Sequence, residues 1–257
     1  PATACENPLA CHIFENQSLI EKGVSMNTLI LACNTIRPEL ERAAAETECP
    51  YPFKWVESGL HLRPDSLRAR LQEELDSIEN VDRVLLGFGF CGHAVVGLIS
   101  RDYELVMPKV DDCITLLLGS KENRDRCCDA GGVYFLTKGW LEGETNIWTE
   151  YQAVLARFGP DSTEKIYRRM LAHYEFLGLI DTGAYELDLL LPEVEAIAAT
   201  LNLKTRVLPG TDTYAKKLLS GPWDEGDFVV VPSNTKIELF HVNELFMPRA
   251  GAIQGGY

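Results

Sequence analysis

An apolar run that breaks at once into glycines, Val84-Leu-Leu-Gly-Phe-Gly-Phe-Cys-Gly92, is the feature that most constrains the fold. Such a run is typical of a buried strand in a parallel sheet that ends in a turn. A cysteine lies on that turn, and two other apolar runs lead to a cysteine in the same way. The three strand-end cysteines are Cys33 after residues 28–32, Cys91 after residues 84–88, and Cys113 after residues 105–110.

Segments with strand and helix patterns alternate along most of the chain. A helix is predicted over residues 37–46, a second opens at Pro64 with leucines at helical spacing, and a short apolar helix is predicted over residues 92–99. This alternation predicts an α/β fold, a doubly wound and mainly parallel sheet with helices on both faces. We expect one compact sheet, because no linker-like stretch separates the strands.

The expected domain organisation has three parts. Residues 1–24 are weakly patterned and are predicted to be an N-terminal extension, residues 25–234 form the α/β domain, and residues 235–257 form a C-terminal tail. A split of the domain into two lobes near residues 139–151 is the alternative to one compact unit.

The net charge of −14 makes nucleic acids and anionic membranes poor partners, since phosphate binding needs clustered lysine and arginine. No apolar run approaches the roughly 20 residues of a membrane span. Residues 1–22 lack the charged start and apolar block of a secretory signal, so a cytoplasmic protein is expected. In that compartment the eight cysteines indicate metal binding or catalysis more than disulfides.

The strand-end cysteines are the candidate metal ligands. In an open parallel sheet the carboxyl ends of the strands lie along one edge, where ligands bind, so Cys33, Cys91 and Cys113 can converge there. A helix start at each junction would stabilise a thiolate. The alternative is that all three are buried as small apolar side chains, a common fate of free cysteine.

Three thiolates leave one coordination position open. On a [4Fe-4S] cluster, the open iron could bind a small-molecule substrate or carry out a redox step. On zinc, a substrate thiol or His93 would complete a tetrahedral site suited to methyl transfer. We favour the cluster, because no C-x-x-C pair accompanies the three cysteines.

Other residues near the strand ends are candidates for catalysis or cofactor contact. His93 could be a ligand or a proton donor, or could bond to backbone, and His61 could contact substrate from its loop. Asp112 and the aspartate before it could act as acid or base, pair with Arg37, or cap a helix. Arg37 could hold an anionic substrate, and Gly92 belongs to the turn that carries Cys91.

Several strings resemble the domain-of-unknown-function family numbered 1638, over about residues 28–233. The most specific are Leu86-Gly-Phe-Gly-Phe-Cys-Gly92 and Asp112-Cys-Ile-Thr-Leu-Leu-Leu-Gly-Ser120. The resemblance brings no established activity. Members resemble partners of corrinoid-dependent methyl-transfer systems, which implies a corrinoid or methyltransferase protein as partner.

Two classes of function follow from these observations. One is an enzyme or electron-handling protein, such as an iron–sulfur lyase or reductase, with a small-molecule substrate over the open iron. The other is a non-enzymatic accessory protein of a corrinoid system that holds a structural or stored metal. A zinc-dependent, corrinoid-linked methyltransferase is a third reading.

Overall fold

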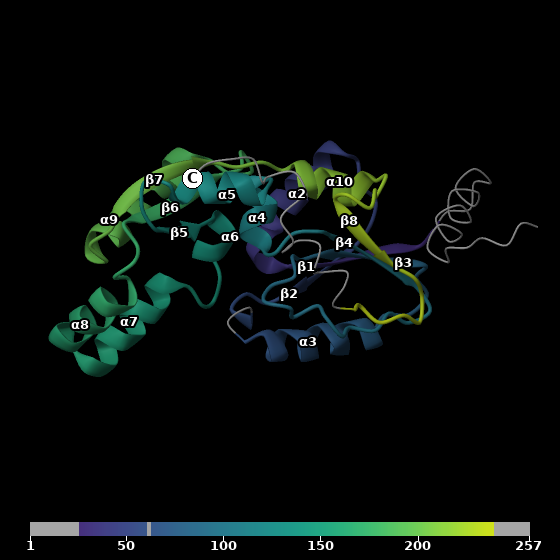
Figure 1. Cartoon of the computed structure of the whole chain (residues 1–257), viewed down its shortest axis with the longest axis horizontal. Helices are drawn as coiled ribbons and strands as arrows, with labels where there is room; N and C mark the ends of the chain where they lie inside the picture. Colours follow the sequence, from purple (N-terminus) through teal and green to yellow (C-terminus); the bar gives the residue numbers. More distant parts are fainter. Residues whose placement is uncertain (1–25, 61–62, 239–257) are drawn as a thin grey trace, which may run out of the picture.

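The computed structural model describes residues 26–60 and 63–238, and its strands form two sheets (Figure 1). The first has the order β2-β1-β3-β4-β8 and consists of β1 (Thr28–Cys33), β2 (Phe53–Val56), β3 (Arg83–Gly87), β4 (Glu104–Pro108) and β8 (Phe228–Val231). The second has the order β5-β6-β7 and consists of β5 (Val133–Leu136), β6 (Phe176–Asp181) and β7 (Lys204–Pro209).

Helices connect most of these strands. They are η1 (Asn34–Ile36), α2 (Arg37–Glu46), α3 (Pro64–Asp76), α4 (Cys113–Leu118), α5 (Lys121–Cys128), α6 (Lys138–Leu141), α7 (Ile147–Phe158), α8 (Pro160–Met170), α9 (Leu187–Thr200) and α10 (Thr213–Ser220). The predicted α/β class is therefore confirmed, and α2 has the predicted bounds.

The expectation of a single sheet is wrong. Strands β1 to β4 pair in parallel, but β8 returns from the far end of the chain and pairs antiparallel with β4, through Leu105↔Val231 and its neighbours. That pairing occupies the edge at which β5 would have continued the sheet. Strand β5 instead begins a second, wholly parallel sheet with β6 and β7. The domain boundaries themselves remain predictions.

Both faces of the first sheet are covered by helices, because its strands are apolar on both sides. Helix α3 packs on one face, and α2, α4 and α10 pack on the other (Figure 1). Along β1, Leu31 faces the α3 side, whereas Ile30 and Ala32 face the opposite side. This alternation is the period of two of a strand buried on both faces.

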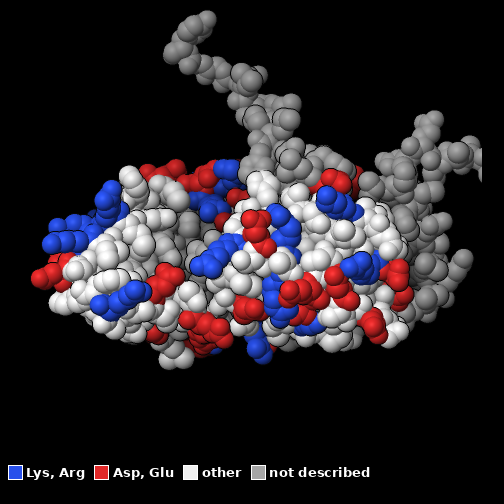
Figure 2. Space-filling model, turned by 90° about the horizontal axis from the view of Figure 1, so that it is seen from below, with Lys and Arg blue, Asp and Glu red and all other residues white. Residues whose placement is uncertain are grey.

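The surface mixes charges of both signs. Figure 2 shows one face, on which the lysine and arginine side chains lie among aspartates and glutamates and do not form a continuous basic patch. Within the described part of the chain, no helix combines the length and the apolar character that a membrane crossing would need.

A buried carboxyl group joins α2 to the end of β6 and so links the two sheets. Glu39 is fully buried, and its Oε1 accepts a hydrogen bond of 2.9 Å from the Thr182 hydroxyl. Within the described residues, its Oε2 has no hydrogen-bond partner. Burial raises the pKa of the Glu39 carboxyl, because the apolar surroundings disfavour the charged form.

This raised pKa predicts a pH dependence of stability. The folded state holds the Glu39 proton more tightly than the unfolded chain, so the stabilisation is full below the unfolded-state pKa and is lost as pH rises through the folded-state pKa. In the variant Glu39→Gln, the side chain at this position has no titratable proton. Urea unfolding from mildly acidic to mildly alkaline pH should show the wild-type free energy of unfolding falling relative to that of the variant. Parallel profiles would contradict the prediction.

Candidate metal centre

The three strand-end cysteines come from neighbouring strands of the first sheet. Cys33 is the last residue of β1, Cys91 lies in the loop after β3, and Cys113 is the first residue of α4, after β4. Because β1, β3 and β4 are adjacent and parallel, the structure brings the three cysteines to the walls of one pocket. The other lining residues are Thr35, Glu57, Gly59, Leu67 and Phe88.

The loop that carries Cys91 is not the short helix predicted over residues 92–99. Cys91, Gly92 and His93 have φ values of 45°, 65° and 71°, all in the left-handed region. A right-handed helix cannot begin through three such residues, and the segment forms turns instead. The backbone amide of Cys91 donates to the carbonyl oxygen of Asp111 at 2.8 Å, which ties the loop to the segment that leads into α4.

A close approach of two backbones sets the position of this loop. A Cβ atom on Gly89 would lie 2.6 Å from the Cα atom of Asp112. Only glycine allows the chain after β3 to pass this close to the start of α4. The contact holds Cys91, two residues after Gly89, beside Cys113, directly after Asp112.

Hydrogen-bond donors surround the sulfur atoms. The Cys33 Sγ and the Thr35 Oγ1 are 2.9 Å apart, and the Thr35 hydroxyl also hydrogen-bonds to the thiol group of Cys113. The backbone of Gly89 and that of Cys113 hydrogen-bond to the Cys91 side chain. Such bonds favour a thiolate, which is the form that binds metal.

Burial sets the protonation of the three thiols. Burial raises the pKa of all three thiols, above all that of Cys113, and charge on Cys33 raises the pKa of Cys91 and of Cys113 further. Without a positive charge beside them, the three thiols therefore stay protonated, as buried apolar cysteines do. A metal centre would supply that charge and would displace the thiol protons on binding.

The described residues of the pocket do not by themselves have the geometry of a metal-ion site. Within residues 26–60 and 63–238, no three His, Cys, Asp or Glu side chains are arranged as ligands of a metal ion. The three cysteines share a pocket, and a metal ion or cluster bound there is a proposal.

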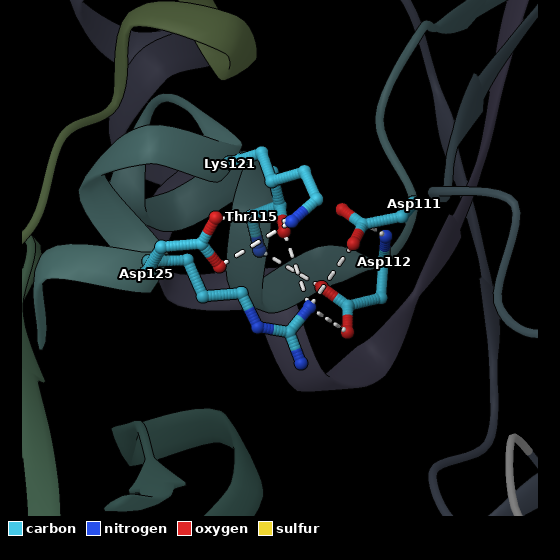
Figure 3. Close-up of polar contacts among 6 residues, drawn as sticks. Asp111, Asp112, Thr115, Lys121 and Asp125 are labelled. Atoms are coloured by element: carbon cyan, nitrogen blue, oxygen red, sulfur yellow. Dashed lines mark hydrogen bonds and ion pairs between the residues drawn. The ribbon is translucent and has the colours of Figure 1, made fainter. Parts of the chain in front are cut away.

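The two aspartates before Cys113 have structural partners. Asp112 caps α4, because its Oδ1 accepts a hydrogen bond of 2.9 Å from the Thr115 amide. The Arg124 Nη1 donates to Asp112 Oδ2 at 2.7 Å and to Asp111 Oδ2 at 3.2 Å, so these aspartates pair with Arg124 and not with Arg37 (Figure 3). The same guanidinium reaches the Thr115 hydroxyl at 3.2 Å, which holds α5 against the start of α4 (Figure 3).

The other predicted site residues do not line the cysteine pocket or lie outside the described residues. Arg37 lines a separate cleft, where its Nε donates to Glu41 Oε1 at 2.6 Å. His93 is exposed, and its carbonyl oxygen accepts a hydrogen bond from Arg68. Gly92 packs towards Pro64, and His61 is one of the residues that the structure does not describe.

Three residues of this region were missed in the sequence. Thr35 and Glu57 line the pocket, and Glu57 follows β2 just as the cysteines follow their strands, a position that could have been read as part of the site. Arg124 lies on α5, which was not predicted. The serine cap at Ser120, whose hydroxyl accepts from the Asn123 amide, was the available signal for that helix.

Fold and pocket together define an α/β protein with a thiol-lined site at the carboxyl edge of its first sheet. The family model described as "Protein of unknown function (DUF1638)" matches residues 55–219, and the chain belongs to this family. The match includes Cys91 and Cys113 and begins after Cys33. No curated protein and no solved structure matches the chain.

Proposed function

We propose that this protein holds a [4Fe-4S] cluster on Cys33, Cys91 and Cys113, with one iron open to a small substrate or to a redox step. The observation that supports a cluster is the convergence of three thiols, from three adjacent parallel strands, on one pocket. Three cysteine ligands leave one iron of a cubane without a protein thiolate, and this open iron is where chemistry takes place.

A cluster and a single zinc ion differ in the spacing that they require of their sulfur ligands. Sulfur ligands of one zinc ion lie about 4 Å from each other, because each Zn–S bond is about 2.3 Å long. In a cubane each cysteine binds a different iron, so the sulfur atoms stand further apart. We favour the cluster because three cysteines without a C-x-x-C pair are typical of it, and metal analysis tests that choice.

The hydrogen bonds to sulfur fit the same proposal. The reduction potential of an iron–sulfur centre depends on hydrogen bonds to its sulfur atoms, on burial and on net charge. The Thr35 hydroxyl hydrogen-bonds to the side chains of Cys33 and Cys113, and backbone groups hydrogen-bond to the side chain of Cys91. Thr35 is thus a positioning residue for two of the three proposed ligands.

Glu57 is the residue best placed to meet a substrate at the open iron. It lines the pocket from the end of β2, and its carboxylate is 44% exposed while paired with Arg70. An exposed carboxylate beside a largely apolar pocket can orient a small polar substrate or move a proton. The substrate must be small, because the cysteine pocket is narrow.

The decisive experiment is the metal content of protein purified without oxygen. We expect about four irons and four sulfides per chain, with the brown colour of an iron–sulfur protein. About one zinc and no iron would contradict the cluster and favour a zinc-thiolate methyltransferase. Absence of metal, even after anaerobic reconstitution with iron and sulfide, would also contradict it and would leave an accessory protein of a corrinoid system as the better proposal.

A further inference from the structure

A second cavity, separate from the cysteine pocket, lies where strand ends from the two sheets meet. It has a volume of about 520 Å³, within the range of small-molecule sites. Asn34 follows β1, Lys138 follows β5 and Ala184 follows β6, and all three line this cleft. The carboxyl ends of parallel strands are where α/β proteins bind ligands, so the cleft has the position of a binding site.

The cleft is lined by two glutamates, Glu41 and Glu142, and by three cations, although the whole chain has a net charge of −14. The cations are Arg37, Arg42 and Lys138, each paired with the glutamate four residues later. Both arginines use Nε for these pairs, at 2.6 and 2.8 Å. Among the described residues, these two ion pairs use one nitrogen of each guanidinium, and the Nη groups can also donate to the oxygens of a carboxylate or a phosphate.

The cleft contains a buried hydrogen-bond acceptor that a donor group of a ligand could pair with. Asn34 lines the cleft, and its Oδ1 is buried without a hydrogen-bond partner within the described residues. Buried polar atoms in folded proteins are nearly always paired, so each exception calls for an explanation. A ligand hydroxyl or amine would pair with this oxygen.

The walls of the cleft are fixed against each other. A Cβ atom on Gly139 would lie 2.3 Å from the carbonyl oxygen of Thr35, so the backbone of α6 touches η1. Across the cleft, a Cβ atom on Gly183 would lie 2.6 Å from Arg42 Nη1. The backbone walls of the cleft are therefore held in place before a ligand arrives, which lowers the cost of binding.

We propose that this cleft binds a small organic oxyanion, a carboxylate or a phosphate, that also carries a hydroxyl or amine group. Arg37, Arg42 and Lys138 bind the oxyanion, and Asn34 accepts from the hydroxyl or amine. The site is independent of the proposed cluster. Short helix η1 separates the two, with Asn34 lining the cleft and Thr35 lining the cysteine pocket.

Isothermal titration calorimetry on the full chain tests the proposal with two probes, glycerol 3-phosphate and glycerate. At least one should bind with a Kd of about 1 mM or tighter, and the better probe identifies the acid group. Glycerol, which lacks the charge, should not bind. Propyl phosphate or propionate, which lack the hydroxyls, should bind more weakly than the matching probe.

Variants locate the binding. Arg37→Gln and Lys138→Met should each weaken it by about tenfold or more, whereas Asn34→Leu should remove the preference for the hydroxylated probe. Arg168→Gln is the matched control, because Arg168 forms the same kind of pair with Glu164 on an exposed helix, and it should change nothing. Cys91→Ser should also leave binding intact.

The outcomes separate this proposal from the cluster. Failure of both probes to bind, or binding that the cleft variants leave unchanged, would overturn the oxyanion site and would leave the cluster proposal untouched. Circular dichroism of each variant shows that a loss of binding is not a loss of folding.

Discussion

Replacing Cys91 with serine is expected to abolish the iron–sulfur centre. Iron and sulfide should fall from about four of each per chain to near zero, with loss of the brown colour, and Cys33→Ser and Cys113→Ser should do the same. A serine hydroxyl is a harder and far less acidic ligand than a thiol, and a pocket with three sulfur donors has no spare thiol to replace it. Anaerobic metal and sulfide analysis measures the effect.

Two other cysteines serve as matched controls. Cys49 is half-buried between α2 and β2, and Cys128 is exposed at the end of α5, and neither lines the cysteine pocket. Cys49→Ser and Cys128→Ser should keep the full iron and sulfide content. If all three pocket variants retained their metal as well, the convergence of Cys33, Cys91 and Cys113 would have no role in metal binding.

The variant Arg83→Met is expected to lower the free energy of unfolding by about 3–5 kcal/mol. Arg83 on β3 lies directly opposite Glu104 on β4 and forms an ion pair with it, with side-chain exposures of 6% and 11%. The guanidinium also lies over the Trp223 ring, 4.3 Å from its centroid. Removing it leaves the Glu104 charge buried without its arginine, which is costly. Urea unfolding measures the loss.

Two controls accompany the Arg83→Met variant: a double variant that removes both members of the buried pair, and a variant that breaks an exposed ion pair. Arg83→Met combined with Glu104→Leu should recover most of the lost stability, because replacing both members of a buried ion pair with apolar groups is often neutral. Arg168→Met breaks an exposed pair and should cost about 0–1 kcal/mol. A small loss for Arg83→Met alone would show that this pair does not stabilise the β3–β4 register that places Cys91 beside Cys113.

The sequence by itself determined the local elements and the positions of the cysteines on them. Pro64 marks the start of α3, and α2 runs over the predicted residues, because helix periodicity and proline at a first turn are encoded within a few positions. That parallel strands bring Cys33, Cys91 and Cys113 to one edge of the sheet could be expected for the same reason, since an apolar run and the turn after it are local signals.

Tertiary structure alone decided which strands pair and which side chains meet. Strand β8 pairs antiparallel with β4 at the edge of the first sheet. Residues 228–231 do not indicate this partner, because strand pairing depends on contacts between segments far apart in the chain. The left-handed turn at Cys91 lies next to the close contact of Gly89 with Asp112, which joins residues far apart in the chain. The cleft joins Asn34, Lys138 and Ala184, which only the packing of two sheets brings together. Local periodicity determines whether a segment forms a helix or a strand. Which elements pack against it depends on the burial of apolar surfaces from segments that are distant in the sequence.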